Sequence, residues 1–194
     1  MAGTRARRES FAERRERRAA VDDPAVVLEA AARFLEVRSR SVFEVRRRLG
    51  GAGYRADLVD GAIARMTELG MLDDEAFART WVESRDRARP RGERAIREEL
   101  RLKGIDRETV ELVLGERRDR AFALSETTGG DDDGEPVSAD RTAAERLLAK
   151  NARALARVAD PRQRRQRAYA LLARHGFDPE TCGEVAASIN EEPS

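Results

Sequence analysis

One pattern of apolar residues occurs three times in the chain, each time around a glycine. The three copies are centred on Gly53, Gly104 and Gly176, with apolar residues eight and four positions before the glycine and one, six and ten positions after it. These residues are Val45, Leu49, Tyr54, Val59 and Ile63; Ile96, Leu100, Ile105, Val110 and Leu114; and Ala168, Leu172, Phe177, Cys182 and Ala186. Spacings of three to four residues predict helices, and the glycine marks the end of one helix before the next begins. The pattern therefore predicts a repeated helical unit.

Helix-capping residues mark where these helices begin. Ser or Thr followed three residues later by Glu forms a capping box, and Asp, alone or before Pro, is a common helix start. Such starts occur at Asp23, Ser41, Asp73, Asp106, Thr142, Asp160 and Asp178. No segment shows a strand-like alternation long enough to assign. We therefore predict an all-α protein of three tandem three-helix repeats that stack into an elongated array, because a repeat of about 50 residues has too little core to be stable alone.

Two stretches do not fit the repeat. Residues 1–20 carry seven Arg and three Glu, with Phe11 as the only large apolar residue. Residues 125–140 carry six acidic residues and no basic ones, among Gly, Ser and Pro. Neither composition provides a face to bury. The predicted domain organisation is as follows: a disordered Arg-rich arm over 1–22, repeat 1 over 23–70, repeat 2 over 71–124, an acidic flexible insert over 125–141 and repeat 3 over 142–190.

Composition and motifs argue against an enzyme. Charged residues make up 39% of the chain and aromatic residues 5%, which fits many solvated helix faces around a thin core. The sequence has no phosphate-binding glycine loop and no nucleophile elbow. The single histidine, His175, is predicted to lie in a last helical turn, and Cys182 in the core. Asp131, Asp132 and Asp133 lack the spacing of metal ligands, so we predict no catalytic residues, no cofactor and no metal.

The cellular location follows from what the sequence lacks. No apolar run approaches the 18 residues that a membrane span requires, and the Arg-rich N-terminus has no hydrophobic stretch typical of a secretory signal. One cysteine cannot form an intramolecular disulfide. We therefore predict a cytoplasmic protein.

Basic clusters are the remaining candidates for function. All of the 38 basic residues except Lys103 and Lys150 are arginines, and the middle helix of each predicted repeat contains several. These are Arg46, Arg47 and Arg48; Arg94, Arg97 and Arg101; and Arg162, Arg164, Arg165 and Arg167. One interpretation is an ordinary solvated face, paired with neighbouring glutamates, in a chain whose Arg content reflects a GC-rich genome. The other is a row of positive charge along the array, suited to an extended polyanion or an acidic protein groove.

Two segments resemble the RecX regulatory family. Residues 71–82, MLDDEAFARTWV, followed by Arg85, are similar to the central signature of that family, as are residues 96–105, IREELRLKGI. The segments 35–63 and 147–189 resemble its flanking repeats. The resemblance implies a curved, all-helical monomer.

The resemblance also implies a partner and a site. RecX proteins bind the RecA recombinase and its filament on single-stranded DNA, and they inhibit its recombinase, ATPase and coprotease activities in DNA repair, recombination and the SOS response. A weak direct contact with DNA is compatible with this role, and no membrane partner is expected. The basic positions that match are Arg46, Arg48, Arg85, Arg97, Arg101, Lys103, Arg162 and Arg165.

Two alternatives remain open at this point. A helix, a glycine turn and a second helix also describe helix-turn-helix units, so the protein is alternatively a DNA-binding module that acts independently of RecA. The second alternative is a plain helical scaffold that binds an unrelated partner.

Overall fold

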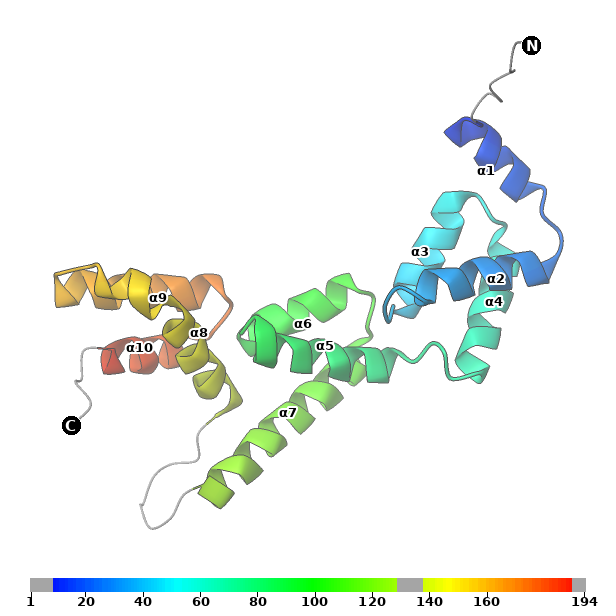
Figure 1. Ribbon diagram of the computed structural model, residues 1–194. Helices are drawn as coiled ribbons and strands as arrows, with labels where there is room; N and C mark the ends of the chain where they lie inside the picture. The colour runs from blue at the N-terminus through cyan, green and yellow to red at the C-terminus, as the bar shows by residue number, and fades with distance from the viewer. Residues whose placement is uncertain (1–8, 129–137, 190–194) are drawn as a thin grey trace. The chain divides into compact units, whose positions relative to one another are not determined.

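A computed structural model describes residues 9–128 and 138–189, and every regular element in these two ranges is a helix (Figure 1). The helices are α1 (Phe11–Ala19), α2 (Pro24–Leu35), α3 (Val42–Ala52), α4 (Ala56–Glu68), α5 (Asp74–Ala88), α6 (Glu93–Leu102), α7 (Arg107–Thr128), α8 (Ala139–Ala156), α9 (Pro161–Arg174) and α10 (Pro179–Ser188). Helices α2–α4, α5–α7 and α8–α10 form the three predicted triplets. The all-α prediction is confirmed for the described residues.

The chain divides into two compact units, residues 1–77 and 78–194. In the first unit, α2, α3 and α4 enclose a core that includes Val27, Val45 and Ile63. In the second unit, α8, α9 and α10 enclose another that includes Leu147 and Leu172. The first and third triplets thus bury their own apolar stripes, and the pattern residues of the second triplet are buried as well. None of the described helices combines the length and apolarity that crossing a membrane requires.

Backbone hydrogen bonding explains the repeated pattern. Gly53, Gly104 and Gly176 have φ angles of 104°, 77° and 83°, in the left-handed region that glycine adopts without strain. In each copy the N–H of the residue after the glycine donates to the carbonyl of the leucine four positions before it, at 3.3, 3.1 and 3.4 Å. This bond closes the helix and brings the two apolar side chains together. Fourteen of the fifteen pattern residues are buried; the exception, Tyr54, is half-buried with Arg18 over its ring.

The arm expected to be disordered over 1–22 is helical from Phe11 to Ala19, and that expectation is wrong for these residues. Ser10 and Glu13 form a capping box, which compensates for the lack of an apolar stripe. The helix also has a neighbour: an added Cβ on Gly53 would lie 2.8 Å from the carbonyl oxygen of Arg15. Residues 1–8 of the predicted arm lie outside the described residues.

The acidic insert is shorter than the predicted 125–141. Helix α7 continues to Thr128, and α8 begins at Ala139, so only 129–137 separate them, outside the described residues. Ser138, not Thr142, caps α8, because its hydroxyl accepts a hydrogen bond from the Arg141 N–H at 3.1 Å. Thr142 lies inside the helix and donates its own hydroxyl to the Ser138 carbonyl.

Candidate macromolecule-binding surface

The middle helices of the first two repeats carry the same ion pair. In repeat 1, Arg46 on α3 contacts Asp60 on α4 at 3.0 Å; in repeat 2, Arg97 on α6 contacts Glu111 on α7 at 2.9 Å. In each, the arginine stands seven residues before the repeat glycine and the acid seven after it. We call this the middle-helix ion pair. Its carboxylate neutralises the arginine locally, so Arg46 and Arg97 contribute less attraction for a polyanion than their exposure suggests.

Arg97 is held more firmly than Arg46. Its guanidinium also contacts Glu93 at 2.8 Å, one helical turn earlier. The hydrogen bond to Glu111 raises the pKa of Arg97 against the effect of burial, with a further contribution from Glu93. Arg97 in turn lowers the pKa of Glu111. Two carboxylates therefore surround this predicted site residue, which makes it part of the repeat's own structure.

Two further predicted residues of these helices lie on the surface. Arg101 is 68% exposed and pairs with Glu98 three residues before it at 2.7 Å. Such a pair contributes about 0–1 kcal/mol, so it opens readily for a partner. Arg48 is exposed on α3, with its guanidinium 5.7 Å from the centre of the Phe34 ring.

The structure brings Arg85 and Lys103 together on one tryptophan. The Arg85 guanidinium carbon lies 4.4 Å, and the Lys103 ammonium nitrogen 4.6 Å, from the centre of the Trp81 ring. Glu99 accepts hydrogen bonds from Trp81 Nε1 at 2.8 Å and from Arg85 Nε at 2.6 Å. We call these four residues the Trp81 cluster. It places two cations against one aromatic ring.

Sequence reasoning missed Trp81 and Glu99 as members of this cluster. Trp81 is only half-buried, and its indole N–H donates to Glu99. One sequence signal was available: Arg85 follows Trp81 by four residues, which places the two on one helix face. No spacing rule connects either residue to Lys103, which comes from the end of α6.

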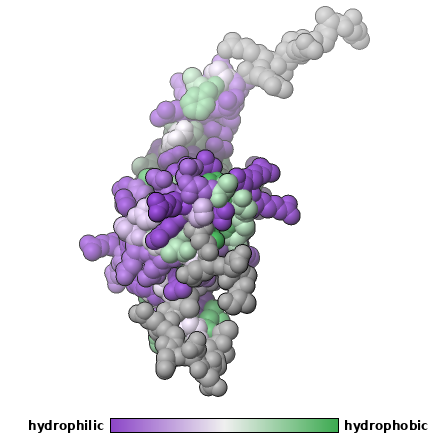
Figure 2. Space-filling model, turned by 90° about the vertical axis from the view of Figure 1, so that its left-hand side faces the viewer, coloured by the Kyte–Doolittle hydropathy of each residue, from purple (hydrophilic) through white to green (hydrophobic). Residues whose placement is uncertain are grey.

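The third repeat holds its basic residues differently. Arg162 and Arg165 are exposed on α9, and within the described residues no carboxylate pairs with either guanidinium. Arg164 instead turns back and donates to the Val158 carbonyl at 3.1 Å. Figure 2 views the protein from the side on which α9 lies in Figure 1, and most of the coloured residues on that face are hydrophilic.

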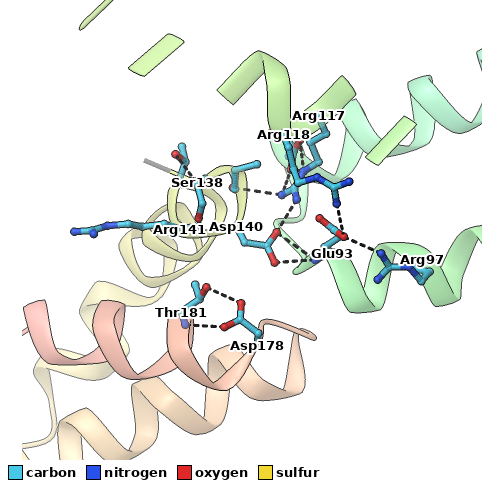
Figure 3. Close-up of polar contacts among 12 residues, drawn as sticks. Glu93, Arg97, Arg117, Arg118, Ser138, Asp140, Arg141, Asp178 and Thr181 are labelled. Carbon is cyan, nitrogen blue, oxygen red and sulfur yellow. Dashed lines mark hydrogen bonds and ion pairs between the residues drawn. The ribbon is translucent and has the colours of Figure 1, made fainter. Parts of the chain in front are cut away.

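A buried arginine joins the second triplet to the third. Arg117 on α7 is 3% exposed and contacts Asp86 on α5 at 2.9 Å and Asp140 on α8 at 2.6 Å (Figure 3). Asp140 also accepts the N–H of Glu93, the first residue of α6, at 2.9 Å. Burial opposes the charge on Arg117, but hydrogen bonds to the two carboxylates outweigh it and raise its pKa. Burial raises the pKa of Asp140, with Arg117 opposing it.

The Asp140 contact has a counterpart in the first unit. Asp74 accepts the N–H of Val42, the first residue of α3, at 2.9 Å. Asp73 caps its own helix α5 as predicted, accepting the Ala76 N–H, and Asp74 lies in the first turn of the same helix. Asp140 was assigned to the acidic insert, and that assignment is wrong, because Asp140 lies in the first turn of α8. In both cases the acid at the start of one triplet caps the middle helix of the triplet before it.

Backbone contacts complete the junction between α6 and α9. The Gly92 N–H donates to the His175 carbonyl at 3.1 Å, and His175 Nδ1 lies 3.3 Å from the Pro90 carbonyl oxygen. His175 is the C-cap residue of α9, as its predicted position requires. In the described residues no group of three or more His, Cys, Asp or Glu has an arrangement that would hold a metal ion. Asp131, Asp132 and Asp133 lie outside them.

Comparisons with known proteins identify the family. Residues 28–66 match the family model described as RecX, first three-helix domain, and residues 73–114 match RecX, second three-helix domain. The regulatory protein RecX of Mycolicibacterium vanbaalenii is 32% identical over 162 residues, covering 80% of this chain and 78% of the relative. That of Mycobacterium marinum is 30% identical over 153 residues, covering 79% and 78%.

Solved structures share the fold. The crystal structure of RecX from Lactobacillus salivarius aligns with a TM-score of 0.67 and 19% identity, covering 88% of this chain and 99% of that one. A second RecX crystal structure aligns with a TM-score of 0.63 and 19% identity, covering 87% and 72%. At this identity the structures support the fold alone. Together with the sequence relatives, the three-helix domains establish that the chain belongs to the RecX family of regulatory proteins.

Proposed function

We propose that this protein binds RecA and its filament on single-stranded DNA and inhibits its recombinase, ATPase and coprotease activities. It thereby modulates DNA repair, recombination and the SOS response in the cytoplasm. The regulatory role follows from the family. The observation that carries the binding proposal is the Trp81 cluster, which lies within the segment that matches the second RecX domain.

The Trp81 cluster suits an acidic groove on a protein. The two cations rest on one ring, and Arg85 is further held by Glu99 at 2.6 Å, so little side-chain freedom remains to be lost on binding. Cations in fixed positions favour a partner with carboxylates at matching positions. A ligand that binds one state of a filament better than the next state stabilises that state. Binding of this kind would slow the ATP turnover of RecA without any catalytic residue in the regulator.

The test is a DNA-dependent RecA ATPase assay combined with cosedimentation. The wild-type protein should lower the ATPase rate and sediment with filaments. The double variant Arg85→Gln/Lys103→Gln should require at least about 10-fold more protein for the same inhibition, equivalent to about 1.4 kcal/mol. The charge-preserving swap Arg85→Lys/Lys103→Arg should retain most of the activity, because both cations remain.

A matched control removes the same amount of charge elsewhere. Arg33 and Arg65 are 71% and 55% exposed in ion pairs of the first repeat, and neither is a predicted site residue. Arg33→Gln/Arg65→Gln should therefore inhibit like the wild type. If wild-type protein neither slows RecA nor sediments with its filaments, the proposal is wrong. If Arg85→Gln/Lys103→Gln inhibits as well as Arg33→Gln/Arg65→Gln does, the Trp81 cluster is not the contact.

A further inference from the structure

The third repeat lacks the middle-helix ion pair of the other two. The two positions that form it are Arg46 and Asp60 in repeat 1 and Arg97 and Glu111 in repeat 2. The corresponding residues of repeat 3, seven before and seven after Gly176, are Tyr169 and Gly183. An aromatic ring has replaced the arginine, and a residue without a side chain has replaced its acidic partner. Tyr169 is 39% exposed.

The charge around Tyr169 also differs from that of the other middle helices. Helix α6 contains three Arg and three Glu, whereas α9 contains five Arg and no acidic residue. Arg162, Arg165 and Tyr169 stand at i, i+3 and i+7, which places them on one side of the helix. A rise of 1.5 Å per residue puts Arg165 about 6 Å and Arg162 about 10 Å along the axis from Tyr169. The side therefore presents two guanidinium groups and an aromatic ring in line.

We propose that this side of α9 binds single-stranded nucleic acid directly, with Arg162 and Arg165 on backbone phosphates and Tyr169 stacked on a base. Guanidinium groups match phosphate oxygens through paired hydrogen bonds. Every base has a face on which an aromatic side chain stacks, so such a site needs no particular sequence. In the other repeats the position of Gly183 holds Asp60 or Glu111, and each pairs with an arginine. An acidic side chain at Gly183 would repel the phosphates, so the glycine favours binding.

This site does not depend on the proposed inhibition of RecA. It uses a different helix from the Trp81 cluster, and its ligand is the nucleic acid alone. An acidic protein surface is the competing partner for the two arginines, and it is distinguished by measurements made without RecA.

The experiment measures binding of a fluorescent oligo(dT) to the full-length protein by anisotropy, without RecA, at several salt concentrations. Tyr169→Ala should weaken binding about 5- to 150-fold, the range for losing one base–aromatic stack. Tyr169→Phe should bind like the wild type, because the ring remains. Arg162→Gln/Arg165→Gln should reduce the slope of log affinity against log salt by about 1.4, or about 0.7 for each phosphate contact.

Two further variants test the position and guard against general effects of charge. Gly183→Glu should weaken binding through its negative charge. A steric effect is not expected, because an added Cβ on Gly183 meets no atom within 4 Å. Arg33→Gln/Arg65→Gln removes the same charge from the first repeat and should leave binding unchanged. The proposal is overturned if Tyr169→Ala binds oligo(dT) normally. It is also overturned if the α9 variants lose only cosedimentation with RecA filaments, since the surface would then bind protein.

Discussion

Arg117 and Met66 occupy corresponding positions, at the same distance after the repeat glycines Gly104 and Gly53, and both are buried. One repeat thus holds an arginine where another holds a methionine. A buried ion pair gains little overall, because removing both charges from water offsets their attraction. Removing one partner is different, since it leaves the other charges buried without compensation. The contribution of Arg117 is therefore to hold α8 beside α5 and α7 at a defined position.

Replacing Arg117 with methionine should lower the free energy of unfolding of the second unit by about 3–5 kcal/mol, because Asp86 and Asp140 lose their counter-charge. Urea unfolding followed by the fluorescence of Trp81, the only tryptophan, measures this. The control is Arg118→Met: Arg118 is 52% exposed in an ion pair with Glu93, and its loss should cost no more than about 1 kcal/mol. Equal midpoints for the two variants would show that the buried position is not structural.

At the scale of helices, stability depends on how each one ends and begins. Gly176 ends α9 with a φ angle of 83°, and its Cα faces the first turn of α6, where an added Cβ would lie 2.8 Å from the Ala95 nitrogen. Asp178 then begins α10 by accepting two hydrogen bonds from Thr181, at 2.9 and 2.6 Å. The repeat glycine of the third triplet thus both stops a helix and allows two backbones to approach closely.

Two alanine substitutions in the third triplet should have opposite effects. Gly176→Ala should destabilise the protein by about 1–3 kcal/mol, because it forces a side chain into the left-handed region and against Ala95. Gly183→Ala, inside α10 and in open space, should stabilise it by about 0.5–1 kcal/mol through better helix propensity. Thermal unfolding followed by circular dichroism measures both, and a loss of stability in Gly183→Ala would contradict the expectation.

The cap of α10 should contribute to the pH dependence of stability. Burial opposes ionisation of Asp178, but the hydrogen bonds from Thr181 outweigh this effect and lower the pKa of Asp178 from its ordinary value in the folded protein. A lowered folded pKa gives stability that is present above the unfolded pKa and is lost as the pH falls through the folded value. Asp178→Ala should therefore cost about 0.5–2 kcal/mol at pH 7 and less at pH 3. Urea unfolding at the two pH values tests this, with Glu180→Ala as the control.

At the scale of the whole molecule, positive and negative charges nearly cancel. The chain has 38 basic and 37 acidic residues, so its net charge is +1. Long-range attraction to a polyanion is correspondingly weak, and binding depends on local groups of side chains. Two such groups emerge, the Trp81 cluster and the exposed side of α9. They differ in kind, since one holds its cations on a ring and the other leaves them without carboxylate partners in the described residues.

The salt dependence of binding to single-stranded DNA should distinguish the proposed α9 site from the alternative of a helix-turn-helix DNA-binding protein. Two phosphate contacts predict that affinity falls only about 7-fold between 50 and 200 mM salt, whereas a helix-turn-helix protein with six to ten contacts would lose about 10³- to 10⁵-fold. Anisotropy titrations of the full chain without RecA measure this quantity. A loss of 10³-fold or more would favour the RecA-independent DNA-binding alternative.

The sequence by itself determined the all-α fold, the three triplets and most of their core. These follow from local rules: apolar spacing selects the buried side of a helix, and a left-handed glycine with an apolar residue after it ends that helix. Local rules also placed most helix starts. They were wrong at the start of α8 and in the arm, because Thr142 and Ser138 are both acceptable caps and the helix α1 has no apolar stripe to reveal it.

Only the tertiary structure decided which arginines are paired with acids of the protein and which are left to bind a partner. Arg46 and Arg97 look alike in sequence to Arg162 and Arg165, yet the first two face acids on a neighbouring helix and the last two face none in the described residues. Likewise, nothing local distinguishes Asp140, which is buried against Arg117, from the other acids of its stretch. The physical reason is that apolar burial is periodic along a helix, whereas an ion pair depends on which helix packs opposite.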